Sequence, residues 1–137
     1  VDELRRLSHQ LTPTISAKQS LSDKIESLIY TIKKTGYIDV AVHIHDFDPP
    51  LSDDIQTGIY RIIQEQLNNI YKHARASAIS IDIQKENNNV VLKVTDNGIG
   101  FRVETAKNGI GLENIKRRAS VLGGEAVIQS SPGMGCK

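Results

Sequence analysis

RIIQEQLNNIYKHA, residues 61–74, has two different faces when it is wound as a helix. Successive helical residues turn by about 100°, so Glu65, Asn69 and Lys72 lie along one face. The other face is apolar and carries Ile63, Leu67, Ile70 and Ala74. An acid, an amide and an amine in register could hold a metal ion and a phosphate. A solvated helix face with a Glu–Lys ion pair explains the same stretch, and it is the more frequent arrangement.

A second stretch, VTDNGIGF at residues 94–101, brings a carboxylate out of a strand and into a glycine-containing turn. Asp96 is the carboxylate, and Gly98 and Gly100 follow it at alternate positions. Glycine permits a positive φ and lets a flat ligand approach the backbone closely. Asp-Asn-Gly is also ordinary turn chemistry, so a plain turn explains this stretch when it is taken alone.

A third stretch, NGIGL at residues 108–112, leads into a predicted helix. Glycines before a helix leave its first N–H groups free at the positive end of the helix dipole, which favours an anion. The stretch is neither a Walker loop nor a dinucleotide fingerprint, since the further spaced glycine or Gly-Lys-Ser/Thr is missing. Gly-x-Gly alone is therefore a weak indication of a phosphate site.

The hydrophobic pattern around these stretches predicts the remaining elements. Apolar spacing predicts helices over 21–34, from Asp53 or Asp54 to about Ala74, and over 112–122. Alternation predicts strands over 40–44, 79–84 and 90–94, and a last short strand through Ala126 and Ile128. The second and third strands are joined by a short polar turn and form a hairpin. We therefore predict an α+β fold, a two-layer sandwich with helices on one face of a mixed sheet.

Composition excludes several classes of protein. Lys and Arg number 17 and Asp and Glu 16, so the net charge of +1 offers no general attraction to nucleic acid or an anionic membrane. The length of 137 residues, with 39% hydrophobic residues, fits one globular domain. Cys136 is the single cysteine, which excludes an internal disulfide and fits a reducing compartment. No apolar run approaches the roughly 18 residues of a membrane helix.

Taken together and in this order, the three stretches resemble the N, G1 and G2 boxes of the gyrase, heat-shock chaperone, histidine kinase and MutL ATPase superfamily. QEQLNNIYKHARAS (64–77), GLENIKRRA (111–119) and the short gap between Gly100 and Gly109 most resemble sensor histidine kinases like NarX and DesK. The likeness extends from about Leu4 to Gly135. It implies the Bergerat-type ATP-binding fold.

The resemblance implies a role for each matched polar residue. Asn69 would coordinate Mg²⁺ through its side-chain oxygen, and Glu65 would be the general base that orients the attacking nucleophile. Lys72 and His73 would contact phosphate. Asp96 would accept the exocyclic amine of adenine, a bond that the carbonyl of guanine cannot offer.

The resemblance also implies roles for the matched glycines. Gly98 and Gly100 would make room for the base. Gly109 and Gly111 would place backbone amides against the phosphates, and Leu112 would begin the helix behind them. The expected ligands are therefore ATP and Mg²⁺.

The chain departs from the family pattern in two places. Near its end the family usually has Gly-x-Gly-Thr, whose threonine helps to hold adenine, whereas GMG (133–135) is followed here by Cys136. The phosphate-accepting histidine belongs on a dimerisation helix well upstream, and His9 matches the end of the following helix instead. His43 and His45 are expected to be exposed strand residues, since no cysteine or acidic cluster completes a metal site around them.

We therefore expect residues 1–14 to be the end of an upstream dimerisation helix. Residues 15–137 would be an ATP-binding catalytic domain that transfers the γ-phosphate of ATP to a histidine outside this chain. The family continues with one more strand, which would follow Lys137. The implied partners are the dimerisation and phosphoacceptor helices of the same protein, a response regulator, and a second copy in a homodimer, with no direct nucleic acid. The expected location is cytoplasmic, with any membrane anchor in a sensor region outside this chain.

Two other functions remain open. A serine kinase of the anti-sigma-factor type has the same fold, although it needs no helix such as residues 4–13 ahead of it. A non-catalytic ATPase-like docking module would keep the fold without phosphotransfer, although the intact Glu65, Asn69 and Asp96 argue against it. Because phosphohistidine is acid-labile, the acid stability of the product separates the two kinases.

Overall fold

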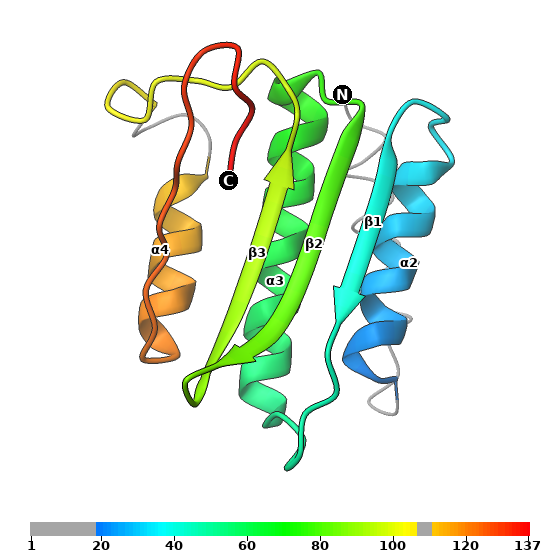
Figure 1. Ribbon diagram of the computed structural model, residues 1–137, viewed down its shortest axis with the longest axis vertical. Helices are drawn as coiled ribbons and strands as arrows, with labels where there is room; N and C mark the ends of the chain where they lie inside the picture. The colour runs from blue at the N-terminus through cyan, green and yellow to red at the C-terminus, as the bar shows by residue number, and fades with distance from the viewer. Residues whose placement is uncertain (1–18, 107–110) are drawn as a thin grey trace.

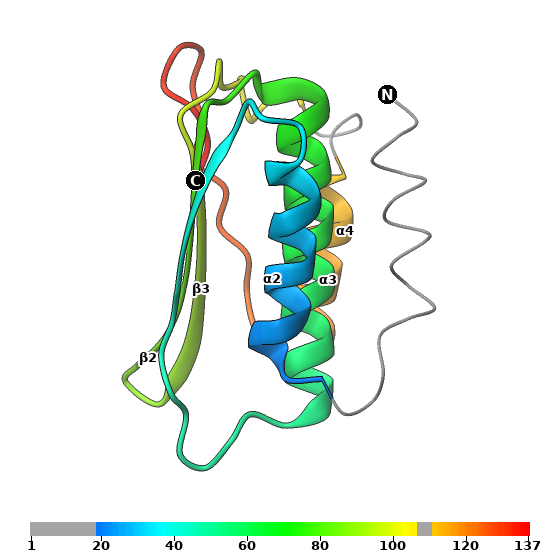
Figure 2. The ribbon, with the colours of Figure 1, turned by 90° about the vertical axis from the view of Figure 1, so that its right-hand side faces the viewer.

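The computed structural model describes residues 19–106 and 111–137, which form one sheet with helices on a single face (Figures 1 and 2). Its elements are α2 (Leu21–Lys33), β1 (Asp39–Ile44), α3 (Asp53–Asn69), the π-helix η1 (Ile70–Ala74), β2 (Ala78–Glu86), β3 (Asn89–Asp96) and α4 (Leu112–Val121). The predicted two-layer α+β architecture is confirmed.

The sheet is mixed, with the strand order β1-β2-β3. β1 runs parallel to β2, and β2 runs antiparallel to β3, so Ile81 lies opposite Val42 on one side and Val94 on the other. The hairpin turns at Asn87 and Asn88, whose φ angles are 48° and 67°. Positive φ at both central residues gives the turn a twist that matches the strands.

The core lies between the sheet and the helices α2 and α3 (Figure 2). Its most buried large side chains are Ile25, Ile63, Ile81 and Ile83, each less than 2% exposed. In β2 the inward isoleucines alternate with Ser80 and Asp82, which lie on the other face of the sheet. This alternation is the predicted one, and it leaves the second face of the sheet polar.

The cap of α3 differs from the expected one. Asp53 or Asp54 was the predicted cap, but Ser52 is the N-cap and its hydroxyl accepts a hydrogen bond from the N–H of Ile55 at 3.3 Å. The two aspartates lie in the first turn instead, where their charge meets the positive end of the helix dipole. Serine and aspartate are both favourable N-cap residues, so the sequence alone does not show which of the three residues is the N-cap.

The long helix predicted to end at Ala74 is α-helical only as far as Asn69. Residues 70–74 continue as a π-helix, and Arg75 ends it in the left-handed conformation with φ 49°. The i→i+5 bonds of a π-helix turn the chain less per residue than an α-helix does. Lys72 and His73 are therefore rotated away from the directions that an unbroken α-helix would give them.

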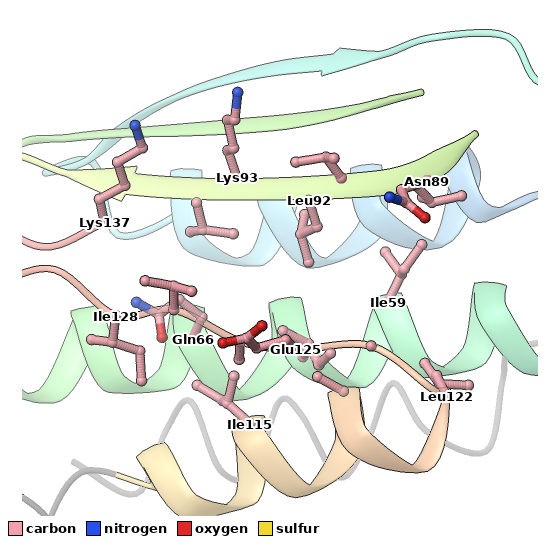
Figure 3. Close-up of a pocket in the computed structure, with 18 of the residues that line it drawn as sticks. Ile59, Gln66, Asn89, Leu92, Lys93, Ile115, Leu122, Glu125, Ile128 and Lys137 are labelled. Carbon is pink, nitrogen blue, oxygen red and sulfur yellow. The ribbon is translucent and has the colours of Figure 1, made fainter. Parts of the chain in front are cut away.

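The last predicted strand, through Ala126 and Ile128, is wrong. Residues 125–129 form no strand, and isolated bridges pair Cys136 with Asp96 and with Ser130. A cavity of about 1010 Å³ lies beside this segment, lined also by β3, α3 and α4 (Figure 3). Strand assignment needs a neighbouring backbone to accept and donate hydrogen bonds, and residues 125–129 lie across the cavity from β3.

Candidate functional site

Asn69, the last residue of α3, is a buried amide at the junction with η1. Its side chain is 8% exposed, and its Nδ2 has no hydrogen-bond partner among the described residues. A buried polar atom without a partner is costly, so this amide fits a ligand. Rotating the amide would present Oδ1 in place of Nδ2, and an amide oxygen is a suitable ligand for Mg²⁺. Asn69 therefore fits the predicted cation site.

The π-helix carries the two side chains predicted to bind phosphate, those of Lys72 and His73. Lys72 is half-buried on η1, and His73 beside it is exposed. Both side chains thus remain available at the end of the long helix that holds Asn69. This placement agrees with a role toward an anion.

Asp96 ends β3 and is buried, with 5% of its surface exposed. Its Oδ1 accepts a hydrogen bond from the N–H of Gly98 at 2.8 Å. Burial raises the pKa of this carboxyl, although the backbone N–H groups of Gly98 and Cys136 act in the opposite direction. A desolvated carboxylate gains more from a hydrogen-bond donor than an exposed one does, which suits it to accept the amine of a base.

The turn after Asp96 packs on the end of η1. A Cβ atom on Gly98 would overlap the carbonyl oxygen of Ala74, and the same carbonyl accepts a hydrogen bond from the N–H of Ile99 at 2.7 Å. Gly100 has φ 64°, and a Cβ there would overlap the carbonyl oxygen of Ser131. Glycine is therefore required at both positions by the neighbouring backbone, and the room for a base that the resemblance implies at Gly98 and Gly100 stays a prediction.

The first and third motifs meet at the start of α4. Gly111 is the N-cap of α4 with φ 67°, and a Cβ atom there would overlap Oε1 of Glu65. The Glu65 carboxylate therefore lies against the N-terminus of α4, where Leu112 is the buried first residue. Gly109, like His9, lies outside the described residues.

Two functional candidates were missed by sequence reasoning. The carboxamide of Asn97 bonds to residues 77 and 78, and its only signal in the sequence was that Asn, like Asp, binds nearby backbone in turns. The sequence shows Cys136 at the position where the family usually has a threonine, but it does not show that Cys136 lies beside Asp96. Their backbones exchange two hydrogen bonds, of 2.9 and 3.3 Å. Burial and then the charge of Asp96 raise the pKa of the Cys136 thiol.

The remaining histidines are separate from this site. The rings of His43 and His45 lie 6.4 Å apart, and both side chains are exposed. No group of three metal-binding side chains occurs in the ranges 19–106 and 111–137. None of the helices described there is long and apolar enough to cross a bilayer.

Comparison with known proteins agrees with this geometry. Residues 54–137 match the family of histidine kinase-, DNA gyrase B- and HSP90-like ATPases. The sensor histidine kinase MctS of Rhizobium johnstonii is 31% identical over 96% of this chain and 29% of its own length. The sensor histidine kinase LiaS of Bacillus subtilis is 33% identical over 98% of this chain and 37% of its own length. The chain thus spans about a third of these relatives.

Solved structures agree on the fold. The histidine kinase domain of a blue-light activated histidine kinase from Erythrobacter litoralis superposes with a TM-score of 0.70 at 20% identity, covering 98% of this chain and 68% of that one. The predicted likeness to the NarX and DesK group is consistent with the sensor kinases among the relatives. The chain belongs to the histidine kinase-, DNA gyrase B- and HSP90-like ATPase family.

Proposed function

We propose that this domain binds ATP with Mg²⁺ and delivers the γ-phosphate to a histidine on the dimerisation helices of the same protein. The observation that carries the proposal is that all three motifs meet at one end of the fold. Glu65 lies against Gly111 at the start of α4, and the turn after Asp96 packs on Ala74 at the end of η1. The sensor kinases among the relatives support the same activity.

The base end of the site is Asp96. Its buried carboxylate accepts the exocyclic amine of adenine. The carbonyl that guanine carries at this position would oppose the carboxylate, so ATP is preferred over GTP.

The phosphate end is formed by α3, η1 and the start of α4. Lys72, His73 and the backbone amides at Gly109 and Gly111 bind the phosphate oxygens. Asn69 holds the Mg²⁺, which neutralises charge on the phosphates when it is bound. This arrangement catalyses mostly by positioning and electrostatics.

Glu65 is the general base for the acceptor histidine. The imidazole nitrogen of the acceptor histidine attacks the γ-phosphorus, and the bond from that phosphorus to the bridging oxygen of ADP breaks. Glu65 orients the imidazole and accepts the proton that it loses. ADP leaves with the electron pair of the broken bond.

The proposal includes the arrangement of the whole protein. Residues 1–14 end a dimerisation helix, and residues 15–137 form the catalytic domain of a cytoplasmic homodimeric kinase that passes its phosphate to a response regulator. One more strand, following Lys137, lies antiparallel to β3 in the cavity. Its support is that Cys136 already bridges Asp96 and Ser130, while Gln129 and Lys137 exchange backbone hydrogen bonds of 2.7 and 2.8 Å.

Nucleotide titration tests the proposal. We expect the chain to bind ATP in the presence of Mg²⁺ and GTP much more weakly, and Asn69→Ala to lose the effect of Mg²⁺ on the ATP Kd while staying folded. Absence of ATP binding, or equal affinity for GTP, would contradict it. With an acceptor helix supplied, an acid-labile phosphoprotein is expected. An acid-stable one would favour the serine kinase, and bound ATP without transfer would favour the docking module.

A further inference from the structure

The side chain of Asn97 joins two loops that carry different parts of the candidate site. Its Oδ1 accepts hydrogen bonds from the N–H groups of Ser77 and Ala78, both at 2.9 Å. Its Nδ2 donates to the hydroxyl of Ser77, also at 2.9 Å. Its backbone N–H donates to the carbonyl of Ala78 at 3.3 Å. The carboxamide therefore bonds to the last residue of the loop between η1 and β2 and to the first residue of β2.

This loop is the continuation of the helix that carries the phosphate-binding residues. Residues 75–77 leave η1, on which Lys72 lies, and η1 in turn follows Asn69. Asn97, on the other side of the junction, directly follows Asp96. The Asn97 bonds thus connect the base end of the site to its phosphate end through one side chain.

A second contact joins the same two segments at a separate point. The N–H of Ile99 donates to the carbonyl of Ala74, against which Gly98 packs. The end of β3 is itself anchored by the pairing of Asp96 with Ile79 and with Cys136, so the contacts of the turn decide how the segment leaving η1 lies against it. The bonds of Asn97 to Ser77 and Ala78 add a second point of attachment, and two points fix an orientation.

We propose that Asn97 is a positioning residue that holds the Asp96 carboxylate at the correct separation from Asn69 and Lys72. The inference rests on the proposed function, because it concerns a ligand that contacts both ends of the site. When the base-binding and phosphate-binding parts of the site already have the correct separation, binding does not lose the free energy needed to order them. A ligand that reaches only Asp96 gains nothing from the fixed separation.

The test compares adenosine with Mg²⁺-ATP, both titrated into the full chain by NMR chemical shifts or calorimetry. For Asn97→Ala we expect the Kd of Mg²⁺-ATP to rise about tenfold, while the Kd of adenosine changes less than about twofold. The ratio of the two values is the readout. A lower folded fraction would change both Kd values by the same factor and leave the ratio unchanged.

Two further variants act as matched controls. Asn97→Asp keeps an oxygen that can accept from both N–H groups, so it should restore most of the Mg²⁺-ATP affinity. Ser77→Ala removes only the bond to the hydroxyl and should leave the ratio close to that of the wild type. Thermal unfolding of each variant identifies a temperature at which all of them are folded.

The outcomes separate the two proposals. If the wild-type chain binds Mg²⁺-ATP no better than adenosine, the proposed function fails. If the wild-type chain shows the preference and Asn97→Ala keeps it, the positioning role of Asn97 is overturned. An equal loss in Asn97→Asp and Asn97→Ala would overturn it as well.

Discussion

At the scale of single residues, Asp96 combines burial with a charge. Because burial raises the pKa of its carboxyl, the folded chain binds this proton more tightly than the unfolded chain does. Between the ordinary pKa of an aspartate and the raised one, the native state therefore carries more protons, and the free energy of unfolding falls as pH rises. Ionised Asp96 thus costs stability at neutral pH, which is consistent with a residue kept for binding.

Asp96→Asn should remove this pH dependence. We expect the variant to be at least as stable as the wild type at neutral pH, and the difference in free energy of unfolding to shrink as pH falls from the raised pKa of Asp96 to the ordinary aspartate pKa. Adenine affinity should fall, because the amide is a weaker acceptor than a carboxylate. Urea denaturation at a series of pH values measures the first effect, and a stability difference that stays constant with pH would contradict it.

Gly111 offers a matched pair of substitutions. Gly111 and Gly123 have φ angles of 67° and 76°, but only at Gly111 would a Cβ overlap Glu65, whereas Gly123 has nothing within 4 Å. Alanine at either position should cost about 1–2 kcal/mol of stability through backbone strain. The Glu65 carboxylate is the flexible end of a side chain, so Gly111→Ala should mainly displace it.

Phosphotransfer to a supplied acceptor helix distinguishes the two glycines. We expect Gly111→Ala to lower the rate at saturating ATP, and Gly123→Ala to leave it close to that of the wild type. Unfolding curves provide the comparison of stability. Equal rates in the two variants would argue against a role for the position of Glu65.

At the scale of elements, the start of α3 depends on Ser52. Its hydroxyl is the side-chain acceptor for the N–H of Ile55, so Ser52→Ala should lower the free energy of unfolding by about 1 kcal/mol. Asp53→Ala should cost less, because that charge acts only through the helix dipole. Chemical denaturation of both variants tests the order, and a larger loss for Asp53→Ala would restore the aspartate cap predicted from the sequence.

Most elements could be predicted because their apolar side chains repeat with the period of one kind of secondary structure only. The alternating isoleucines of β2 and the stripe of α2 each bury one face, and the core confirms both. The change from α3 to η1 could not be predicted, since the helical spacing continues unbroken to Ala74, and the contact of Ala74 with the turn at Gly98 is made by residues far apart in the sequence. The segment through Ala126 and Ile128 has a pattern that fits a strand, but in the described residues only its end, at Gln129, bonds to a neighbouring backbone, that of Lys137.

The candidate site was predictable to a similar degree. The polar face with Glu65 and Asn69 could be read from helical spacing, and Asp96 from its position after a strand. The role of Asn97 could not, because Ser77 and Ala78 are about 20 residues away in the sequence. Which residues a turn contacts is decided by the tertiary fold.

At the scale of the whole molecule, a cavity of about 1010 Å³ lies beside β3. Leu92 and Ile59 point into it from opposite sides (Figure 3). Cys136 lies opposite Asp96 in an antiparallel bridge, so the first residue added after Lys137 would face Val94 on the inner side. The register of any added strand is therefore defined.

Extending the chain with Val-Thr-Val-Thr-Val should stabilise it. The valines would enter the cavity and the threonines would face solvent, which we expect to add about 1 kcal/mol to the free energy of unfolding after the ordering cost. Thr-Val-Thr-Val-Thr is the control, because a shift of one residue reverses the two faces. Urea denaturation compares the two, and equal stabilisation would contradict the predicted register.

The open side of β3 also has a consequence for the behaviour of the domain in concentrated solution. An unpaired strand edge next to an apolar cavity is a template for a strand from another chain. Two molecules that pair in this way hide each other's exposed backbone, and a third can add wherever an edge is still free. Colloidal stability of this domain is therefore expected to depend on whether that edge is occupied, and an occupied edge should raise the concentration at which the protein remains monomeric.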